Sequence, residues 1–485
     1  MKANKDAVNS ATHRLEKDSL GELPVPAEAL YGIHTERARQ NFVLAKRPVH
    51  PELIIAFGVV KEACARANQQ IGVWQDAPEK SEAIIRACSE VASGLLSEHV
   101  IVDALQGGAG TSTNMNVNEI IANRALQLLE KAPGRYDLVS PLEDINRHQS
   151  TNDTFPTALK LAVIRLIHRL EGQLKMLHDA FCEKAQQFDG IIKMGRTEFQ
   201  DAVLTTLGQT MGAFAAVVQR DCQRMGAAEA ALLSVNLGGT AIGTGFGAPP
   251  PYLAQVVDHL KELSGLEFSQ AENLVDATQN ADAFIEVSGL LKTCASSLLK
   301  IATDLRVMSS GPNTGIGEIN LPPMQAGSSI MPGKVNPVIP EAVSQVAFLI
   351  MGYDLAITQA CARGDLELNA FLPLTADCLL YGIDLLVQAC QTLRTRCVQG
   401  ITANEERCKE QAKVALSTAS ILLPVLGYEG AHKAVKDAAE KGVSLRDHVI
   451  EAGYLDAAGF DALMLAEAAA WTNKPKVESK EKEKD

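Results

Sequence analysis

Residues 327–341 read Gly-Ser-Ser-Ile-Met-Pro-Gly-Lys-Val-Asn-Pro-Val-Ile-Pro-Glu and lie between two segments with helical hydrophobic patterns. These fifteen positions hold two hydroxyls, two glycines, three prolines, a lysine, an asparagine and a carboxylate. Gly, Pro, Asn and Ser are ordinary turn residues, whereas a simple turn has no need of the lysine or the glutamate. We therefore interpret residues 327–341 as a loop that carries chemistry rather than as a spacer.

Long helical patterns surround this loop. Apolar residues recur at three- and four-residue steps in five segments, at residues 154–187, 205–234, 279–308, 340–361 and 374–398. Such helices are about twice as long as the globular average and pack naturally as a bundle. Their apolar stripes are wider than a five-helix monomer needs to bury, which predicts association with other subunits. A larger monomeric bundle is the alternative.

We expect a mainly α fold of three domains and a tail. Residues 1–144 form a mixed, mostly helical N-terminal domain that begins with a mobile arm at residues 1–18 and contains a helix at residues 51–71. Residues 145–400 form the long-helix bundle, within which Pro249, Pro250 and Pro251 are expected to prevent a helix from starting. Residues 401–472 form a small helical domain, with helices at 442–452 and 457–468, and the Lys- and Glu-rich residues 473–485 a disordered tail.

Composition excludes several classes of function. The net charge of −13 argues against a nucleic-acid surface. The chain lacks 18 uninterrupted apolar residues, so no membrane span is expected. Its ten scattered cysteines form no C-x-x-C pair and its first residues contain no apolar signal region, which predicts reduced thiols, no zinc site and a cytoplasmic protein.

Three more polar clusters precede helical patterns, at residues 106–118, 146–153 and 195–201. The first lacks the Gly-Lys-Ser/Thr ending of a phosphate loop, so nucleotide binding is not expected. Each cluster could merely cap the helix that follows it. Because they accompany the loop at residues 327–341, we prefer to interpret all four as walls of one polar pocket.

The segment 327–336 with Glu341 resembles the signature of the fumarase/aspartase superfamily, and the other clusters occur in the order and spacing of that superfamily. The resemblance covers about residue 19 to about residue 470. Residues 31–35 (Tyr-Gly-Ile-His-Thr), 149–153 and 336–341 are most similar to aspartases. The resemblance implies the three-domain superfamily fold, a homotetramer with a multi-helix core and composite active sites, and a small dicarboxylate substrate. It implies no required cofactor and leaves activation by a divalent cation open.

The implied reaction is the reversible deamination of L-aspartate to fumarate and ammonia. Removing a proton from the carbon next to the β-carboxylate leaves an enediolate, which the site must stabilise before the amine departs. The resemblance assigns Ser328 as the base, acting as an alkoxide that loop N–H groups near Ser329, Met331 and Gly333 stabilise.

The remaining roles also follow from the resemblance. Hydroxyl groups for the β-carboxylate are assigned to Thr111, Ser150, Thr151 and Ser329. Lys334 and Asn336 pair with the α-carboxylate, lysine as a point charge and asparagine as an orienting donor. Asn152 and Thr197 face the amine.

Glu198 departs from the superfamily pattern, in which Gln or His occupies its position and His pairs with the glutamate that matches Glu341. Two carboxylates in contact cannot both ionise cheaply, so one of the pair is expected to hold a proton. Glu198 is then either an anionic ligand of the substrate ammonium or a protonated acid that assists its departure. It could instead signal another amine-bearing substrate. Asn313 also departs from the pattern, which commonly has Arg there.

Competing functions remain open. A fumarate hydratase of the class II type would use the same scaffold and base, and a lyase for a related amino-dicarboxylate would differ only in substrate. A structural lens protein built on this scaffold would predict loss of Ser328, Lys334 or Asn336, and all three are present. An amino-acid-binding module would have no use for a serine loop of this kind.

Overall fold

The computed structural model describes residues 12–414 and 416–469, and these residues are mainly helical. They form two compact units. Unit 1 comprises the described residues up to Gly172, together with Asp221–Ser296 and Val346–Gln388. Unit 2 comprises Gln173–Arg220, Ser297–Gln345 and the described residues from Ala389 onward.

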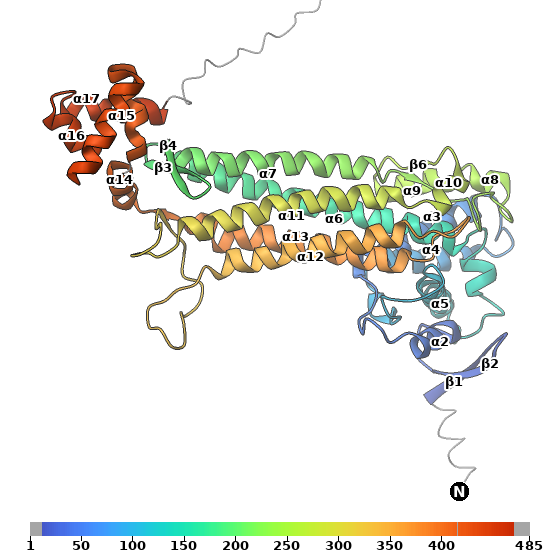
Figure 1. Cartoon of the computed structure of the whole chain (residues 1–485). Helices are drawn as coiled ribbons and strands as arrows, with labels where there is room; N and C mark the ends of the chain where they lie inside the picture. The colour runs from blue at the N-terminus through green and yellow to red at the C-terminus, as the bar shows by residue number, and fades with distance from the viewer. Residues whose placement is uncertain (1–11, 415, 470–485) are drawn as a thin grey trace, which may run out of the picture. The chain divides into compact units, whose positions relative to one another are not determined.

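Five long helices pass through both units, and they confirm the predicted bundle segments to within a few residues at each end (Figure 1). They are α6 (Thr151–Gln187), α7 (Leu207–Ala230), α11 (Asp282–Met308), α12 (Val338–Cys361) and α13 (Leu372–Arg396). Pro156 lies in the second turn of α6, where the chain has only just become helical. The three predicted domains are not tested by this division and stay predictions.

Unit 1 contains the N-terminal elements, in which α3 packs against α4, α5 and α9 (Figure 1). Its elements besides the long helices are β1 (His13–Asp18), β2 (Gly21–Pro26), α2 (Ile33–Asn41), α3 (Pro51–Gln70), α4 (Pro78–Ala92), η1 (Ser97–His99), α5 (Thr111–Leu128), η2 (Pro141–Ile145), β5 (Ser234–Val235), α8 (Pro250–Leu253), α9 (Val256–Ser264), β6 (Ser269–Gln270) and α10 (Leu274–Gln279). The pair β1–β2 is antiparallel and β5–β6 is parallel.

Unit 2 contains a hairpin and a small helical core. Its elements are β3 (Ile192–Thr197), β4 (Gln200–Thr206), β7 (Ile319–Asn320), η3 (Val398–Gly400), β8 (Thr402–Ala403), α14 (Glu405–Val414), η4 (Leu416–Leu422), α15 (Leu423–Lys441), α16 (Leu445–Glu451) and α17 (Ala457–Ala469). The antiparallel strands β3 and β4 cover a core around Leu422, Leu445 and Phe460.

Helix packing in unit 1 combines apolar burial with a few polar contacts. Leu159, Leu166 and Leu170 of α6 are fully buried, as the three- and four-residue spacing predicts. Between α11 and α12, the Ser288 hydroxyl donates to the Asp354 carboxylate at 2.8 Å. Such a contact fixes the register of two helices that apolar side chains alone would leave adjustable.

Two local expectations were wrong. Residues 13–18 of the predicted arm form β1, because the Arg14 guanidinium donates to the carbonyl groups of Pro26, Ala27, Ala29 and Tyr31 and so ties the strand to the chain beyond β2. Helix α8 begins at Pro250 despite the proline run, because the first turn of a helix does not need the proline N–H. The predicted tail at residues 473–485 lies outside the described residues.

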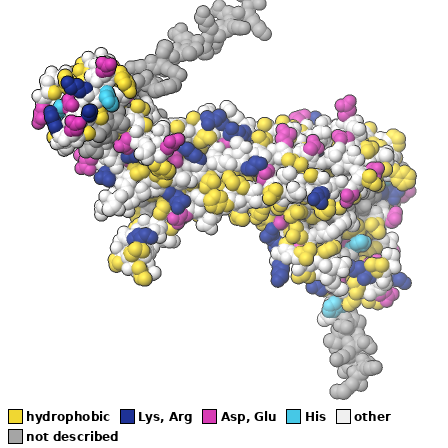
Figure 2. Space-filling model, viewed as in Figure 1, with side chains coloured by type: hydrophobic (Ala, Val, Ile, Leu, Met, Phe, Trp, Pro, Cys, Tyr) yellow, Lys and Arg dark blue, Asp and Glu magenta, His cyan; other side chains and the backbone are white. Residues whose placement is uncertain are grey.

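Helix α12 is apolar on faces that unit 1 does not cover. Phe348 is 58% exposed, Leu349 48% and Leu355 63%, and Figure 2 shows hydrophobic side chains gathered along the long helices. By length and composition alone, Val338–Cys361 and Leu372–Gly400 could cross a membrane, with 33% and 67% of their most apolar windows buried. Bundle helices pass the same test, so this property does not establish a membrane span.

The close contact of Gly110 with Phe155 generates a stability prediction. Gly110 has φ of 94°, and an added Cβ would lie 2.2 Å from the Phe155 ring. We expect Gly110→Ala to lower the free energy of unfolding by about 2 to 4 kcal/mol through overpacking and left-handed strain. Gly190→Ala, where no atom lies within 4 Å of the added Cβ, is the control for thermal unfolding. Equal melting midpoints for the two variants would contradict the prediction.

Candidate active site

The residues predicted to form the site fall into two groups, one in each unit. Unit 1 holds Thr111, Ser150, Thr151 and Asn152. Unit 2 holds Thr197, Glu198, Ser328, Ser329, Lys334, Asn336 and Glu341. Each group is described within its own unit.

The unit 1 group lies at the N-terminal ends of α5 and α6. Thr151 and Asn152 are the first residues of α6, and Ser150 precedes them. The Ser150 hydroxyl accepts the Asn152 N–H at 3.2 Å, while the Ser150 N–H donates to Asp153 at 2.9 Å. This reciprocal cap holds three successive polar side chains at the positive end of a long helix, where a carboxylate is favoured.

Hydrogen-bond direction separates the hydroxyl groups of unit 1. Thr151 Oγ1 accepts from Asn114 Nδ2 at 3.0 Å and Ser150 Oγ accepts from a backbone N–H. Neither hydroxyl donates to a described residue, so both hydrogens are available to a ligand. Thr111 differs, because its hydroxyl donates to the Gly108 carbonyl at 2.7 Å.

Asn152 connects the cap to the glycine-rich turn at residues 236–247. Its side-chain amide donates to the Ala241 carbonyl at 2.7 Å, and the Asn236 amide donates to the Asn152 carbonyl at 3.0 Å. The turn lies between the short strand β5 and the short helix α8. No described residue donates to the Oδ1 atom of Asn152, which is an acceptor suited to an amine.

Two buried charges below this group were missed by sequence reasoning. Asp153 is fully buried and accepts N–H groups from Ser150, Gly238 and Thr240, and burial raises the pKa of its carboxyl to about 6. Lys61 on α3 is 1% exposed, and burial lowers the pKa of its ammonium to about 8. Burial thus acts against the charged form of both groups.

Lys61 reaches the site through amide side chains. Its Nζ donates to Gln149 Oε1 at 2.8 Å and to Asn146 Oδ1 at 3.3 Å. Asn146 Oδ1 also accepts from Asn114, the residue that donates to Thr151. The only sequence signal for this role was a lysine on the apolar face of a predicted helix, which resembles an ordinary solvated lysine.

In unit 2, Thr197 and Glu198 lie at the tip of the β3–β4 hairpin. Glu198 and Phe199 form its two-residue turn, with φ of 53° and 62°. This is the geometry of a type I′ turn, which Asn-Gly would adopt with less strain. Phe199 is 74% exposed and Glu198 is also exposed. The Glu198 carboxylate is therefore exposed at the hairpin tip, and the backbone turn that carries it is strained.

The Ser328 loop is closed by its own backbone. The Ser328 N–H donates to the Lys334 carbonyl at 3.0 Å, and an added Cβ at Gly327 would lie 1.8 Å from that same oxygen. Ser328 Oγ accepts the N–H groups of Ile330 and Met331, each at 3.2 Å. A serine oxygen that accepts two N–H groups is suited to carry negative charge, while its own hydrogen stays free for transfer.

The other loop residues point to no partner within the chain. Ser329 and Lys334 are exposed and Asn336 is half-buried, and no described residue forms a side-chain hydrogen bond or ion pair with them. Glu341 lies in the first turn of α12. Among residues 12–414 and 416–469, no hydrogen bond joins Glu198 to Glu341, so the predicted pair is not formed within one chain.

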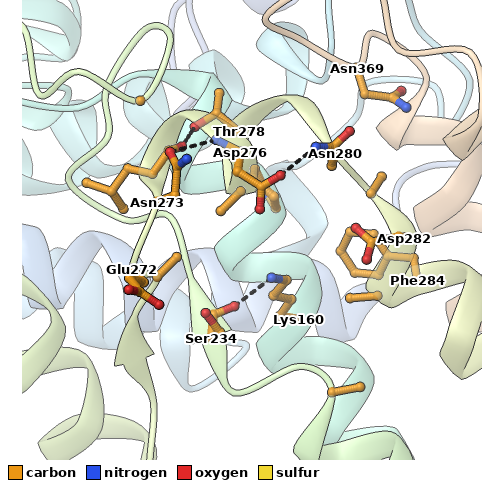
Figure 3. Close-up of a pocket in the computed structure, with 18 of the residues that line it drawn as sticks. Lys160, Ser234, Glu272, Asn273, Asp276, Thr278, Asn280, Asp282, Phe284 and Asn369 are labelled. Carbon is orange, nitrogen blue, oxygen red and sulfur yellow. Dashed lines mark hydrogen bonds between the residues drawn. The ribbon is translucent and has the colours of Figure 1, made fainter.

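A separate cavity of about 760 Å³ in unit 1 contains none of the predicted site residues (Figure 3). Its wall carries the carboxylates of Glu272, Asp276 and Asp282 and one ammonium, Lys160, which donates to the Ser234 carbonyl at 2.6 Å. Burial lowers the pKa of Lys160 to about 8. Three carboxylates against one cation would repel a dicarboxylate. The cavity is therefore not a suitable substrate site.

The described residues contain no group of three or more His, Cys, Asp or Glu side chains that could hold a metal ion. The described cysteines are all free, and most are buried in apolar surroundings. The candidate site residues themselves offer hydroxyl, amide, ammonium and carboxylate groups.

Comparison with known proteins identifies the family to which this chain belongs. A family model described as lyase matches residues 21–352, and one described as fumarase C C-terminus matches residues 419–468. An aspartate ammonia-lyase of Pseudomonas aeruginosa is 47% identical over 94% of this chain and 97% of that protein. An aspartate ammonia-lyase of a Bacillus species is 45% identical over 91% of this chain and 94% of that protein.

Solved structures agree with the sequence relatives. A cobalt-bound fumarate lyase:delta crystallin from Brucella melitensis is 45% identical, with a TM-score of 0.91 over 94% of this chain and 99% of that chain. A class II fumarase from Schistosoma mansoni is 32% identical, with a TM-score of 0.87 over the same shares of both chains. These matches extend over nearly the whole sequence, and the chain belongs to the fumarase/aspartase superfamily of lyases.

Proposed function

We propose that this protein is an aspartate ammonia-lyase that converts L-aspartate reversibly to fumarate and ammonia. The observation that carries the proposal is the near-full-length identity of 45–47% with aspartate ammonia-lyases of Bacillus and Pseudomonas species. The Ser328 oxygen, which accepts two backbone N–H groups, supplies the base that this reaction requires.

The reaction can be written with these residues. Ser328, as an alkoxide, removes a proton from C3 of aspartate, and the β-carboxylate becomes an enediolate with two negative charges. When the enediolate collapses, C2–C3 becomes a double bond, the C2–N bond breaks and the ammonium leaves as neutral ammonia. Ser328 then returns its proton to water. Charge stabilisation at the β-carboxylate is the difficult part of this sequence.

Donors for that charge come from both groups. Thr151 and Ser150 offer free hydroxyl hydrogens at the N-terminal end of α6, and we assign Thr111 and Ser329 to the same carboxylate. Thr111 must first release the Gly108 carbonyl. The buried ammonium of Lys61 lies below Asn146 and Gln149, and it favours an anion above them without contacting it.

The α-carboxylate and the amine use the remaining groups. We assign Lys334 and Asn336 to the α-carboxylate, and Asn152 and Thr197 to the amine. Because the leaving nitrogen already carries the proton with which it departs, an anionic Glu198 beside the ammonium suits the chemistry better than a protonated acid. Glu341 would then have to hold the proton if the two carboxylates meet.

Two observations support a homotetramer with composite sites. The candidate residues are divided between two units, and the side chains of Ser329, Lys334 and Asn336 form no hydrogen bond or ion pair with another described residue. The apolar face of α12 at Phe348, Leu349 and Leu355 supplies a surface for lateral association. We further propose a cytoplasmic location, from the thiol-rich composition, and no required cofactor, with activation by a divalent cation left as a prediction.

A fumarate hydratase is the second candidate, because the class II fumarase of Schistosoma mansoni shares this fold at 32% identity. Glu198 distinguishes the two, since a carboxylate at the hairpin tip favours an ammonium over a neutral hydroxyl as the leaving group. Incubating fumarate with ammonium or with water alone, while following absorbance of the double bond, separates the two activities.

Ser328→Ala is the direct test of the proposed base. The wild-type protein should release fumarate and ammonia from L-aspartate in equal amounts, and the variant should lose about 10³-fold or more in kcat because general-base catalysis contributes about that much. Ser93→Ala, which removes a hydroxyl that donates only to the Glu90 carbonyl, is the control. A wild-type protein that deaminates no aspartate would refute the proposed function, and an active Ser328→Ala would refute the base.

Glu198→Gln tests the role of the unusual carboxylate. If Glu198 binds the substrate ammonium as an anion, the isosteric amide should raise KM for aspartate by about 10- to 100-fold, the value of a charged hydrogen bond. Glu267→Gln, which breaks an exposed ion pair with Lys261, is the control. Unchanged kinetics and pH dependence would remove Glu198 from the mechanism.

Leu355→Glu tests the assembly. A charge on the exposed face of α12 should dissociate the tetramer and abolish activity, because the buried carboxylate would cost more than the contact contributes. Leu95→Glu is the matched control, since Leu95 is 71% exposed but lies outside the bundle. Light scattering after size exclusion gives the mass, and a tetrameric, active Leu355→Glu would show that this face is not an interface.

A further inference from the structure

A buried ion cluster in unit 2 has no role in the reaction described above. Glu318 is 0% exposed and pairs with two cations of strand β3. Its Oε2 lies 3.0 Å from Lys193 Nζ, and its Oε1 pairs with Arg196 Nη1. Lys193 is itself 7% exposed. Burying Glu318 and Lys193 away from water is costly, so the contact needs a reason beyond stability.

The hairpin is irregular beside this cluster. Lys193 and Arg196 are three positions apart, so on a regular strand they would point to opposite faces of the sheet. The register of β3 against β4 shifts between Met194 and Arg196, where Ala202 and Val203 of β4 lie opposite Gly195 alone. The extra residue belongs to β4, and beside this bulge both Lys193 and Arg196 reach Glu318. A Cβ at Gly195 would lie 2.6 Å from the Val203 carbonyl, which explains the glycine.

The backbone around Glu318 is held independently of its carboxylate. The Glu318 N–H donates to the Met308 carbonyl at 2.8 Å, and its carbonyl accepts the Asn404 N–H at 2.9 Å. Ile319 and Asn320 form β7, which pairs with β8. The segment therefore needs no ion pair to keep its path, and the carboxylate serves mainly to hold the hairpin.

The ion cluster lies close in sequence to both the hairpin tip and the Ser328 loop. Arg196 directly precedes Thr197 and Glu198 at the hairpin tip, and Glu318 is ten residues before Ser328. Arg196 also donates to Gln411 on α14, whose amide donates to the Ile316 carbonyl at 2.7 Å. The hairpin, the start of the serine loop and α14 thus share one network.

We propose that Glu318, with Lys193 and Arg196, is a positioning residue that fixes the Thr197–Glu198 hairpin tip relative to the root of the Ser328 loop. This inference rests on the proposed function. Both segments are exposed. Their placement therefore depends on the residues that anchor their ends. A displacement of about 1 Å in such a group can cost about 10²-fold in rate.

The test compares Glu318→Gln and Lys193→Met with the wild-type protein. Each variant is measured for kcat and KM, for the isotope effect with aspartate deuterated at C3, and for hydrogen exchange of residues 192–206 and 321–337. We expect Glu318→Gln to exchange faster in both segments, to lose about 10- to 100-fold in kcat and to show a larger isotope effect, because misplaced groups slow proton abstraction. Glu318→Asp, which keeps the charge, should recover part of the loss.

Asp461→Asn is the matched control, because it breaks an ion pair with Arg446 in the same unit, where the exposed groups lie 3.0 Å apart. Wild-type exchange and an unchanged isotope effect in folded Glu318→Gln would overturn the proposal. If Glu318→Gln does not fold, Lys193→Met decides by the same measures, since it keeps the Arg196–Glu318 pair. A wild-type protein inactive on aspartate would refute the proposed function, and hydrogen exchange would still decide the positioning role.

Discussion

The carboxylate of Asp153 is fully buried, and the surrounding chain is arranged to satisfy it. Three backbone N–H groups, from Ser150, Gly238 and Thr240, converge on its two oxygens. A buried carboxylate without such donors would cost several kcal/mol, about as much as a whole domain has to spare. The start of α6 and the glycine-rich turn are therefore held together, and Ser150, Thr151 and Asn152 stand where this contact puts them.

Each unit contains a buried charged side chain close to its candidate site residues. Lys61 lies below the hydroxyls of unit 1 and Glu318 lies behind the hairpin and serine loop of unit 2. Exposed loops have little packing of their own, so the precision of their side chains must come from the elements that hold their ends. A charge buried with a full set of partners is rigid, since any movement leaves it unpaired in a low dielectric. The exposed groups of both units thus lie next to buried charged side chains that contact several partners.

Sequence periodicity located the helices well and the supporting charges poorly. Apolar residues at helical spacing predicted all five long helices, because a stripe that must be buried leaves a repeating pattern. Lys61, Asp153 and Glu318 left no such pattern, since a buried charge and a solvated one look alike in a helical or loop sequence. Strand β1 was missed for a similar reason. Arg14 of β1 is held by backbone carbonyl groups, and the pattern of side chains in a sequence does not show such contacts.

The sequence by itself determined the mainly helical fold, the superfamily and the identity of the reactive loop, because these depend on hydrophobic spacing and on motifs continuous in the chain. Only the tertiary structure decided which hydroxyl hydrogens are free, that Ser328 Oγ accepts two N–H groups, and that Glu198 lies in a strained turn. Hydrogen-bond direction and backbone strain depend on where distant segments meet. A linear sequence records which groups exist, and the fold sets which of them are already occupied.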